Sequence, residues 1–133
     1  MCNQVTDHSE LDAVISLEQI LQYIQKTYAP LSIILYGSYA DGTNNLNSDF
    51  DALVITSDHE PFHDTSIVDG IPLDVFVYPQ KYFDVEYTCE DFVQIHDGRI
   101  LADSSGIGKA LQEKVQAYLR NRAVKSSAEI QAS

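Results

Sequence analysis

Residues 32–56, SIILYGSYADGTNNLNSDFDALVIT, place two apolar runs on either side of a polar segment. The first run, from Ser32 to Tyr36, is short and nearly continuous, which is typical of a buried strand. The second run, from Asp49 to Thr56, becomes apolar after its first residues and predicts another strand. The residues between the runs are dense in Asp, Asn, Gly and Ser, so we expect a loop there.

The rest of the chain predicts helices and further strands around this stretch. The expected elements in chain order are a helix over residues 9–28, strands over 32–36, 49–56 and 71–78, short helices within 80–95, a short strand over 99–102, and a last helix that carries Leu111, Val115, Tyr118 and Leu119. Residues 57–70 are polar and rich in turn formers, so we expect a connection there. Together these elements predict an α/β (α+β) fold in which helices flank a small mixed sheet.

The length of 133 residues suits one hydrophobic core, so we expect a single domain over residues 1–133. Its core should span about residues 10–122, and residues 123–133 should form a loose tail. The hydrophobic fraction of 44% and the charged fraction of 21% are ordinary for a globular protein, which excludes a wholly disordered chain.

Charge and composition also exclude several kinds of partner. The net charge of −12 opposes binding of a long polyanion such as DNA or RNA. No apolar run approaches the roughly 20 residues that a membrane span requires. The two cysteines are too few for a disulfide framework or a thiolate metal site. We therefore expect a cytoplasmic protein that binds neither a membrane nor long nucleic acid, although a single nucleotide could bind where metal ions and backbone N–H groups supply positive potential.

Three aspartates occupy positions that suggest a metal-binding or catalytic role. Because side chains alternate along a strand, Asp49 and Asp51 point to one face and Phe50 to the other. Asp74 interrupts the otherwise apolar segment IPLDVFVY, residues 71–78. Gathering three negative charges is unfavourable unless cations neutralise them, and carboxylate oxygens suit Mg²⁺ or Mn²⁺. We therefore expect metal ligands that serve phosphoryl or nucleotidyl transfer.

The dipeptide Gly37-Ser38 directly follows the first apolar run. Glycine lets the backbone approach a ligand closely, and serine supplies a hydroxyl and an N–H group at an expected helix N-terminus. The pair predicts a phosphate contact, although an ordinary strand-to-helix turn could have the same sequence. The structural alternatives for the aspartates are a polar turn at Asp49 and Asp51 and an edge-strand charge at Asp74. Neither alternative explains the spacing between the dipeptide and the aspartates.

The segment GSYADGTNNLNSDFDALV, residues 37–54, resembles the Gly-Ser, spacer, Asp-x-Asp signature of the DNA polymerase β-like nucleotidyltransferases. It is similar in spacing to the small members called minimal nucleotidyltransferases, such as MntA-type antitoxins, and to the catalytic domain of kanamycin nucleotidyltransferase. In that family a third carboxylate lies on a later strand, where this chain has Asp74. The resemblance spans roughly residues 11–103. One departure is Asp41, which stands where many relatives carry a basic residue and leaves the role of that loop in phosphate binding open.

The resemblance implies a role for each candidate residue. Asp49 and Asp51 would hold both metal ions, and Asp74 would hold one of them and help to deprotonate the acceptor hydroxyl. Gly37 and Ser38 would contact the triphosphate of an NTP, which we expect to be ATP. The reaction would move a nucleoside monophosphate to a hydroxyl group and release pyrophosphate.

The identity of the acceptor stays open at this point. Relatives that modify antibiotics usually add a helical domain or a dimer partner that shapes the acceptor pocket, and little after Asp103 could do so here. This favours a protein acceptor, as in antitoxins that adenylylate a helical toxin on tyrosine, and it predicts a toxin partner or a second copy of the chain. The alternatives are a small-molecule acceptor, as in antibiotic-modifying enzymes, and a catalytically idle binding module of a toxin–antitoxin pair.

Two other segments resemble known sequence motifs, but we do not expect either of them to form the corresponding site. The segment HEPFH, residues 59–63, matches the zinc-protease pattern, but Pro61 would disrupt the helix that this pattern requires. We therefore expect His59 and His63 to be solvated loop residues. The segment GIGK, residues 106–109, resembles the end of a P-loop that lacks its first glycine, so we expect only a helix start.

Overall fold

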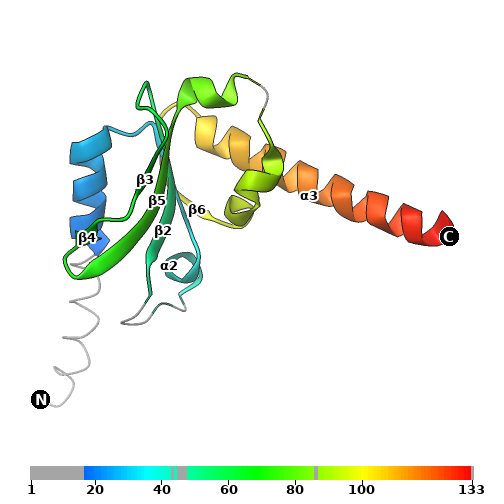
Figure 1. Cartoon of the computed structure of the whole chain (residues 1–133), viewed down its shortest axis with the longest axis horizontal. Helices are drawn as coiled ribbons and strands as arrows, with labels where there is room; N and C mark the ends of the chain where they lie inside the picture. Colours follow the sequence, from blue (N-terminus) through cyan, green and yellow to red (C-terminus); the bar gives the residue numbers. More distant parts are fainter. Residues whose placement is uncertain (1–16, 43, 45–47, 86, 133) are drawn as a thin grey trace, which may run out of the picture.

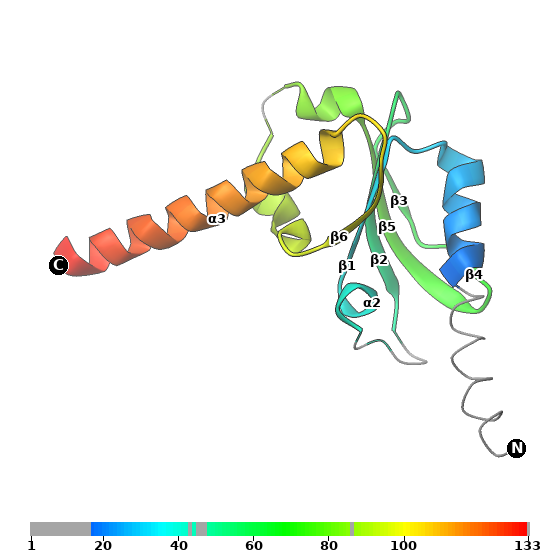
Figure 2. The same ribbon diagram turned by 180° about the vertical axis from the view of Figure 1, so that it is seen from behind.

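The computed structural model describes residues 17–42, 44, 48–85 and 87–132, with side chains as far as residue 122. Its centre is a six-stranded mixed sheet with helices on both faces (Figures 1 and 2). The strands are β1 (Ser32–Tyr36), β2 (Phe50–Thr56), β3 (Phe62–Asp64), β4 (Ile67–Val68), β5 (Ile71–Pro79) and β6 (Arg99–Asp103). The helical elements are a helix over residues 17–28, the short helix α2 (Ser38–Asp41), the 3₁₀ helices η1 (Gln80–Phe83) and η2 (Cys89–Ile95), and the long helix α3 (Ile107–Ala132). This arrangement confirms the expected mixed α/β fold.

The strand order is β3-β5-β2-β1-β6, and β4 also pairs with β5. Strands β2 and β5 run parallel, and every other described pair is antiparallel. The parallel pair is in continuous register from Phe50 opposite Leu73 to Thr56 opposite Pro79. The position of β2 and β5 inside the sheet explains their nearly unbroken apolar sequences, because helices cover both faces of the sheet. Most side chains of β2 are buried, whereas those of β5 alternate between buried and partly exposed.

Helices hold the sheet from both faces (Figures 1 and 2). One face packs on the helix over residues 17–28, whose Ile20, Ile24 and Tyr28 are buried. The opposite face packs on η2 and α3. The buried side chains of that second layer are Phe92 and Ile95 of η2 and Leu111 and Val115 of α3. Full burial of one such side chain contributes about 1.5–3 kcal/mol, so each layer supplies a large share of the folding free energy.

Residues 57–70 contain more regular structure than their polar composition indicates. Strands β3 and β4 lie in this segment and pair with β5 along one edge of the sheet. Asp69 (φ 51°) and Gly70 (φ 80°) join β4 to β5, and positive φ at both positions is what a tight hairpin turn of this kind requires. The expectation of a plain connection over these residues is therefore wrong.

The elements near the two ends differ in length from the expected ones. The helix expected over residues 9–28 is seen over residues 17–28, and its first part lies outside the described residues. The expected strand over residues 99–102 is β6, which is one residue longer. Residues 123–132, expected as a loose tail, continue helix α3, which extends away from the sheet (Figures 1 and 2).

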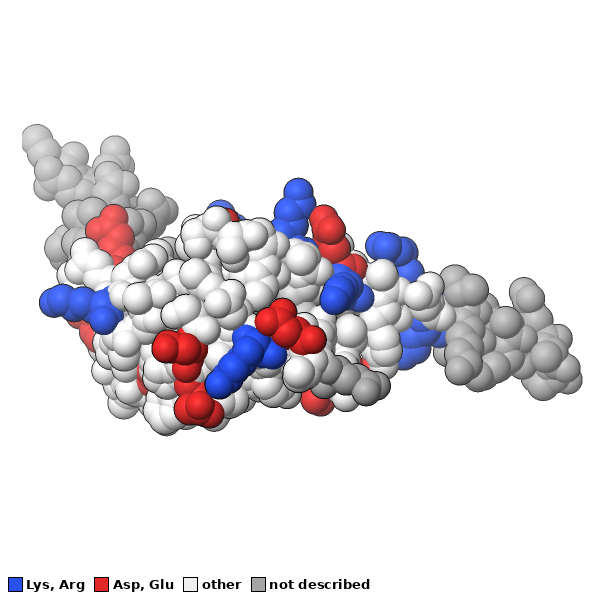
Figure 3. Space-filling model, turned by 90° about the horizontal axis from the view of Figure 1, so that it is seen from above, with Lys and Arg blue, Asp and Glu red and all other residues white. Residues whose placement is uncertain are grey.

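Charged side chains of both signs are interspersed on one face of the molecule (Figure 3). On the face shown in Figure 3, Lys and Arg lie among Asp and Glu and do not gather into one extended basic area. That face offers no continuous positive surface to a polyanion. None of the helices in the described part of the chain is long and apolar enough to cross a membrane.

Candidate active site

Strands β2 and β5 bring two of the three candidate aspartates together. Their register places Asp51 directly opposite Asp74, and neighbouring strands lie about 4.8 Å apart. The negative charge of Asp74 acts on Asp51 across this pair. Asp49 is exposed one residue before β2, and its charge acts on Asp51. The sequence identified these residues, and the strand register gives Asp51 and Asp74 their contact.

Asp51 experiences both burial and like charge. Burial, the hydrogen bond with Asp74 and the negative charges of Asp74 and Asp49 raise the pKa of Asp51 to about 6. The carboxyl group of Asp51 therefore holds a proton more readily than an ordinary aspartate does. A cation neutralises the same charge and can take the place of that proton. The pair of Asp51 and Asp74 therefore favours the binding of a cation.

The backbone of Gly37 lies against the Asp51 carboxylate. A Cβ atom at Gly37 would lie 2.3 Å from Oδ2 of Asp51, far inside any normal contact. Gly37 also has φ 73° and ψ −157°, a backbone conformation that is essentially restricted to glycine. It is the N-cap of α2, so Ser38 is the first residue of that helix, as expected. The glycine of the Gly-Ser dipeptide and Asp51 therefore meet in space.

Tyr36 is a residue near the site that sequence reasoning missed. It precedes Gly37 on β1, pairs with Asp51 and is buried. Burial and the negative charges of Asp74 and Asp51 raise its pKa well above the ordinary value, although a hydrogen bond with the Gln94 side chain acts in the opposite direction. The hydroxyl therefore stays protonated at neutral pH. In the sequence Tyr36 looks like the last apolar residue of a strand. Only its position before Gly37 could have indicated that it lies near the site.

His63 is the second residue that the sequence did not place at the site. It lies on β3, opposite Phe76 of β5, and its Nε2 atom is 2.5 Å from Oδ1 of Asp74. Its ring stacks on Phe76, with centroids 4.1 Å apart and planes 3° apart. The side chains of His63 and Asp74 are 45% and 39% exposed, so the contact lies at the surface of the site. His63 is therefore exposed, as expected, but it lies on a strand and not in a loop.

His59 has a different environment. Its ring packs edge-on against Tyr28 with centroids 5.1 Å apart, and its Nδ1 atom is 2.7 Å from the Glu60 carbonyl oxygen. Because His59 and His63 do not share a helix face, the zinc-protease pattern has no structural basis here. The sequence argument based on Pro61 gave the same answer.

The donor atoms of the site determine which metal ions it can bind. In the part of the chain that the structure describes, no three His, Cys, Asp or Glu side chains are grouped closely enough to hold a metal ion by themselves. Asp51 and Asp74 nevertheless offer adjacent carboxylate oxygens, which are the donors that Mg²⁺ and Mn²⁺ prefer. These ions usually bind through one or two carboxylates and complete their shell with substrate phosphates and water. The pair therefore fits a divalent ion that arrives with a nucleotide.

A small cavity of about 70 Å³ lies on the strand face that carries Asp51 and Asp74. Leu53 and Phe76 line it, and each lies two residues after one of the paired aspartates on the same strand face. The other lining residues are Tyr78, Asp91, Phe92 and Gln94. A mainly aromatic hollow, lined in part by η2, thus lies further along the same strand face as the acidic pair.

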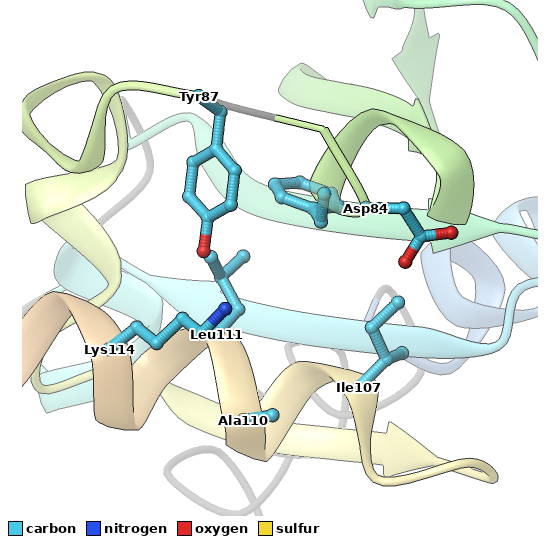
Figure 4. A pocket seen from close by; sticks show the side chains of 7 residues that line it. Asp84, Tyr87, Ile107, Ala110, Leu111 and Lys114 are labelled. Atoms are coloured by element: carbon cyan, nitrogen blue, oxygen red, sulfur yellow. The ribbon is translucent and has the colours of Figure 1, made fainter.

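A larger pocket of about 170 Å³ lies between η1 and α3 (Figure 4). Tyr87 points toward Leu111 and Lys114 of α3, and Nζ of Lys114 lies 5.9 Å from the Tyr87 ring centroid. This pocket lies near the end of β5, whereas the aspartates lie near the starts of β2 and β5. It is therefore separate from the acidic site.

The family assignment rests on the whole described core. The chain belongs to the nucleotidyltransferase domain family, whose sequence model matches residues 17–127. No curated protein matches the chain significantly.

Two solved structures show the same fold. A toxin–antitoxin solved with AMP-PNP is similar at 17% identity with a TM-score of 0.53, over 86% of this chain and 95% of that one. A mutant of the toxin–antitoxin MntA-HpeT is similar at 18% identity with a TM-score of 0.51, over the same shares. At such identities the similarity concerns the fold alone. It confirms the nucleotidyltransferase fold that the Gly-Ser and Asp-x-Asp spacing predicted.

Proposed function

We propose that this chain transfers a nucleoside monophosphate from an NTP, with ATP as the expected donor, to an acceptor hydroxyl and releases pyrophosphate. The observation that carries the proposal is the meeting of Gly37, Asp51 and Asp74. The Cβ clash at Gly37 and the register of β2 and β5 place a glycine backbone and two carboxylates within one small region. Membership of the nucleotidyltransferase domain family supports the same reaction class.

Each residue of the site has a defined task in this proposal, and Asp74 has two. Asp49, Asp51 and Asp74 hold divalent metal, Mg²⁺ or Mn²⁺, which would neutralise phosphate charge and help to orient the acceptor. Gly37 and Ser38 bind the triphosphate through the backbone and hydroxyl at the start of α2. Asp74 accepts the proton of the acceptor hydroxyl, since its side chain is 39% exposed and therefore accessible to an acceptor.

A protein hydroxyl is the acceptor that we favour. The similar solved structures are toxin–antitoxins, one of them solved with AMP-PNP, which supports both a protein partner and an NTP for this chain. Helix α3 extends from the sheet and offers a long surface on which a partner can bind (Figure 1). A small-molecule acceptor and a catalytically idle module of a toxin–antitoxin pair are the alternatives.

Incubation of the protein with ATP labelled in the α-phosphate, Mg²⁺ and cell lysate separates these alternatives. Label on a protein supports the favoured acceptor, and label on a small molecule supports an antibiotic-type reaction. Absence of any transferred label, with intact nucleotide binding, would instead support the idle module.

A further inference from the structure

We propose that His63 is a positioning residue that holds the Asp74 carboxylate in the orientation needed for transfer. This inference rests on the proposed function, because it assigns Asp74 a role in the reaction. Neither the family signature nor the sequence pattern includes this histidine.

The contact between His63 and Asp74 follows from the way the strands pair. His63 lies opposite Phe76 in the antiparallel pair of β3 and β5, and Asp74 precedes Phe76 by two residues. Residues two apart on a strand point to the same face, so the imidazole reaches Asp74 diagonally. The Nε2 atom ends 2.5 Å from Oδ1 of Asp74, which is hydrogen-bond distance.

Two constraints fix the imidazole ring. Strand pairing with Phe76 sets the backbone of His63, and parallel stacking at a centroid distance of 4.1 Å sets the plane of the ring. A donor that is held in this way can in turn restrict the carboxylate that accepts its hydrogen bond. His63 donates its Nε2–H group to Asp74. The Nε2 atom carries a proton both in the charged ring and in one of the two neutral tautomers, so either form can make this hydrogen bond.

Asp74 is held on two sides as a result. Oδ1 of Asp74 contacts His63, and Asp51 lies directly opposite Asp74 on β2. The Asp74 side chain is 39% exposed, so without the imidazole it could rotate toward solvent. A carboxylate that has to bind metal or accept a proton gains from such restraint, because reacting groups must be held close to their productive geometry.

Removal of a hydrogen-bond partner of a metal-binding or catalytic carboxylate typically lowers metal affinity or activity about 10- to 100-fold. We expect a loss in this range for His63→Ala. The loss should fall on kcat, since Asp74 acts in the transfer step, while KM for the NTP should change little because Asp49, Asp51 and Gly37 are intact.

The test compares His63→Ala, His63→Gln and the control His59→Ala. The glutamine variant keeps an N–H donor at this position and should recover most of the lost kcat. The control removes a histidine four residues away that contacts Tyr28 and the Glu60 carbonyl instead of the acidic pair. It should leave kcat and KM near the wild-type values.

Three measurements are made on each purified full-length variant: kcat and KM for label transfer, binding of MnCl₂ without nucleotide by electron paramagnetic resonance, and thermal melting. Weaker Mn²⁺ binding and lower kcat in His63→Ala, with recovery in His63→Gln, support the proposal. Unchanged Mn²⁺ affinity and kcat in a folded His63→Ala protein would overturn it, and so would a glutamine variant no better than alanine. If the wild type transfers no nucleotide, the proposed function fails, while Mn²⁺ binding still decides whether His63 orders Asp74.

Discussion

Replacement of Gly37 with alanine should disable the site while the protein still folds. The new Cβ atom would lie 2.3 Å from Oδ2 of Asp51 and only 3.2 Å from its Cγ atom. The short Asp51 side chain must therefore move. Since Asp51 is the partner of Asp74 in the acidic pair, its displacement should separate the two carboxylates and weaken nucleotide and metal binding.

The stability cost has a backbone part and a contact part. Gly37 has φ 73° and ψ −157°, and a residue other than glycine in such a conformation costs on the order of 1–3 kcal/mol. For a chain of this length, each kcal/mol corresponds to roughly 3–5 °C in melting temperature. Movement of Asp51 relieves most of the steric contact, so the expected decrease remains within a range in which the variant is folded at 25 °C.

Gly70→Ala is the matched control for this prediction. Gly70 has φ 80°, but a Cβ atom there would meet nothing within 4 Å, so this variant carries a backbone cost of about 1–2 kcal/mol and no contact. Thermal melting in EDTA should show destabilisation of both variants, and only Gly37→Ala should lose NTP affinity and label transfer. If folded Gly37→Ala binds and transfers nucleotide like Gly70→Ala, the contact between Gly37 and Asp51 has no functional role.

Further predictions concern the acidic pair, the nucleotide and a buried carboxylate. Asp74→Asn should keep or raise the melting temperature of the metal-free protein but lower the transfer rate by about two orders of magnitude or more, because asparagine cannot accept the proton; unfolding, or a rate near the wild type, would contradict this. NTP affinity measured by calorimetry should be far higher in Mg²⁺ than in EDTA, and equal affinities would count against a metal-bound triphosphate. Ser38→Ala should weaken nucleotide binding more than stability, and a purely structural effect would exclude a phosphate contact. Burial raises the pKa of Asp64, but hydrogen bonds from Tyr28, Tyr23 and Ser66 outweigh burial and leave it below the ordinary value. Asp64 therefore stabilises the fold above about pH 4, the range of an unfolded aspartate, and this contribution is lost as the pH falls through its lower folded pKa. Denaturation from pH 6 to pH 2 should show a flatter acid limb for Asp64→Asn than for the wild type, and parallel curves would contradict the assignment.

Local sequence patterns were sufficient for the main strands and for the candidate aspartates. The apolar runs that became β1, β2 and β5 are long enough to identify by composition, and Gly37, Asp49, Asp51 and Asp74 stand out against them. The register that sets Asp51 opposite Asp74 could not be predicted, because it depends on how the chain returns to the sheet after β2. The same holds for the approach of Gly37 to Asp51, which joins two strands in space.

His63 shows why the edge of the site was missed. Strand β3 has three residues, which is too short for an alternating pattern to be distinguished from a loop, and Pro61 pointed to irregular structure. The contact with Asp74 spans eleven positions and exists only after both strands pair with the sheet. A usable signal was the Asp69-Gly70 dipeptide between apolar residues, which is typical of a tight hairpin turn and would have indicated strands on both sides.

The most direct test of the central claim is the fate of each phosphate of ATP. Wild-type protein and Asp51→Asn are incubated with Mg²⁺, lysate and ATP labelled in either the α- or the γ-phosphate. Nucleotidyl transfer predicts that the wild type moves label from the α-position to the acceptor, that label from the γ-position appears in pyrophosphate, and that Asp51→Asn moves neither. Label moved from the γ-position to the acceptor, or equal α-label transfer by Asp51→Asn, would contradict the account.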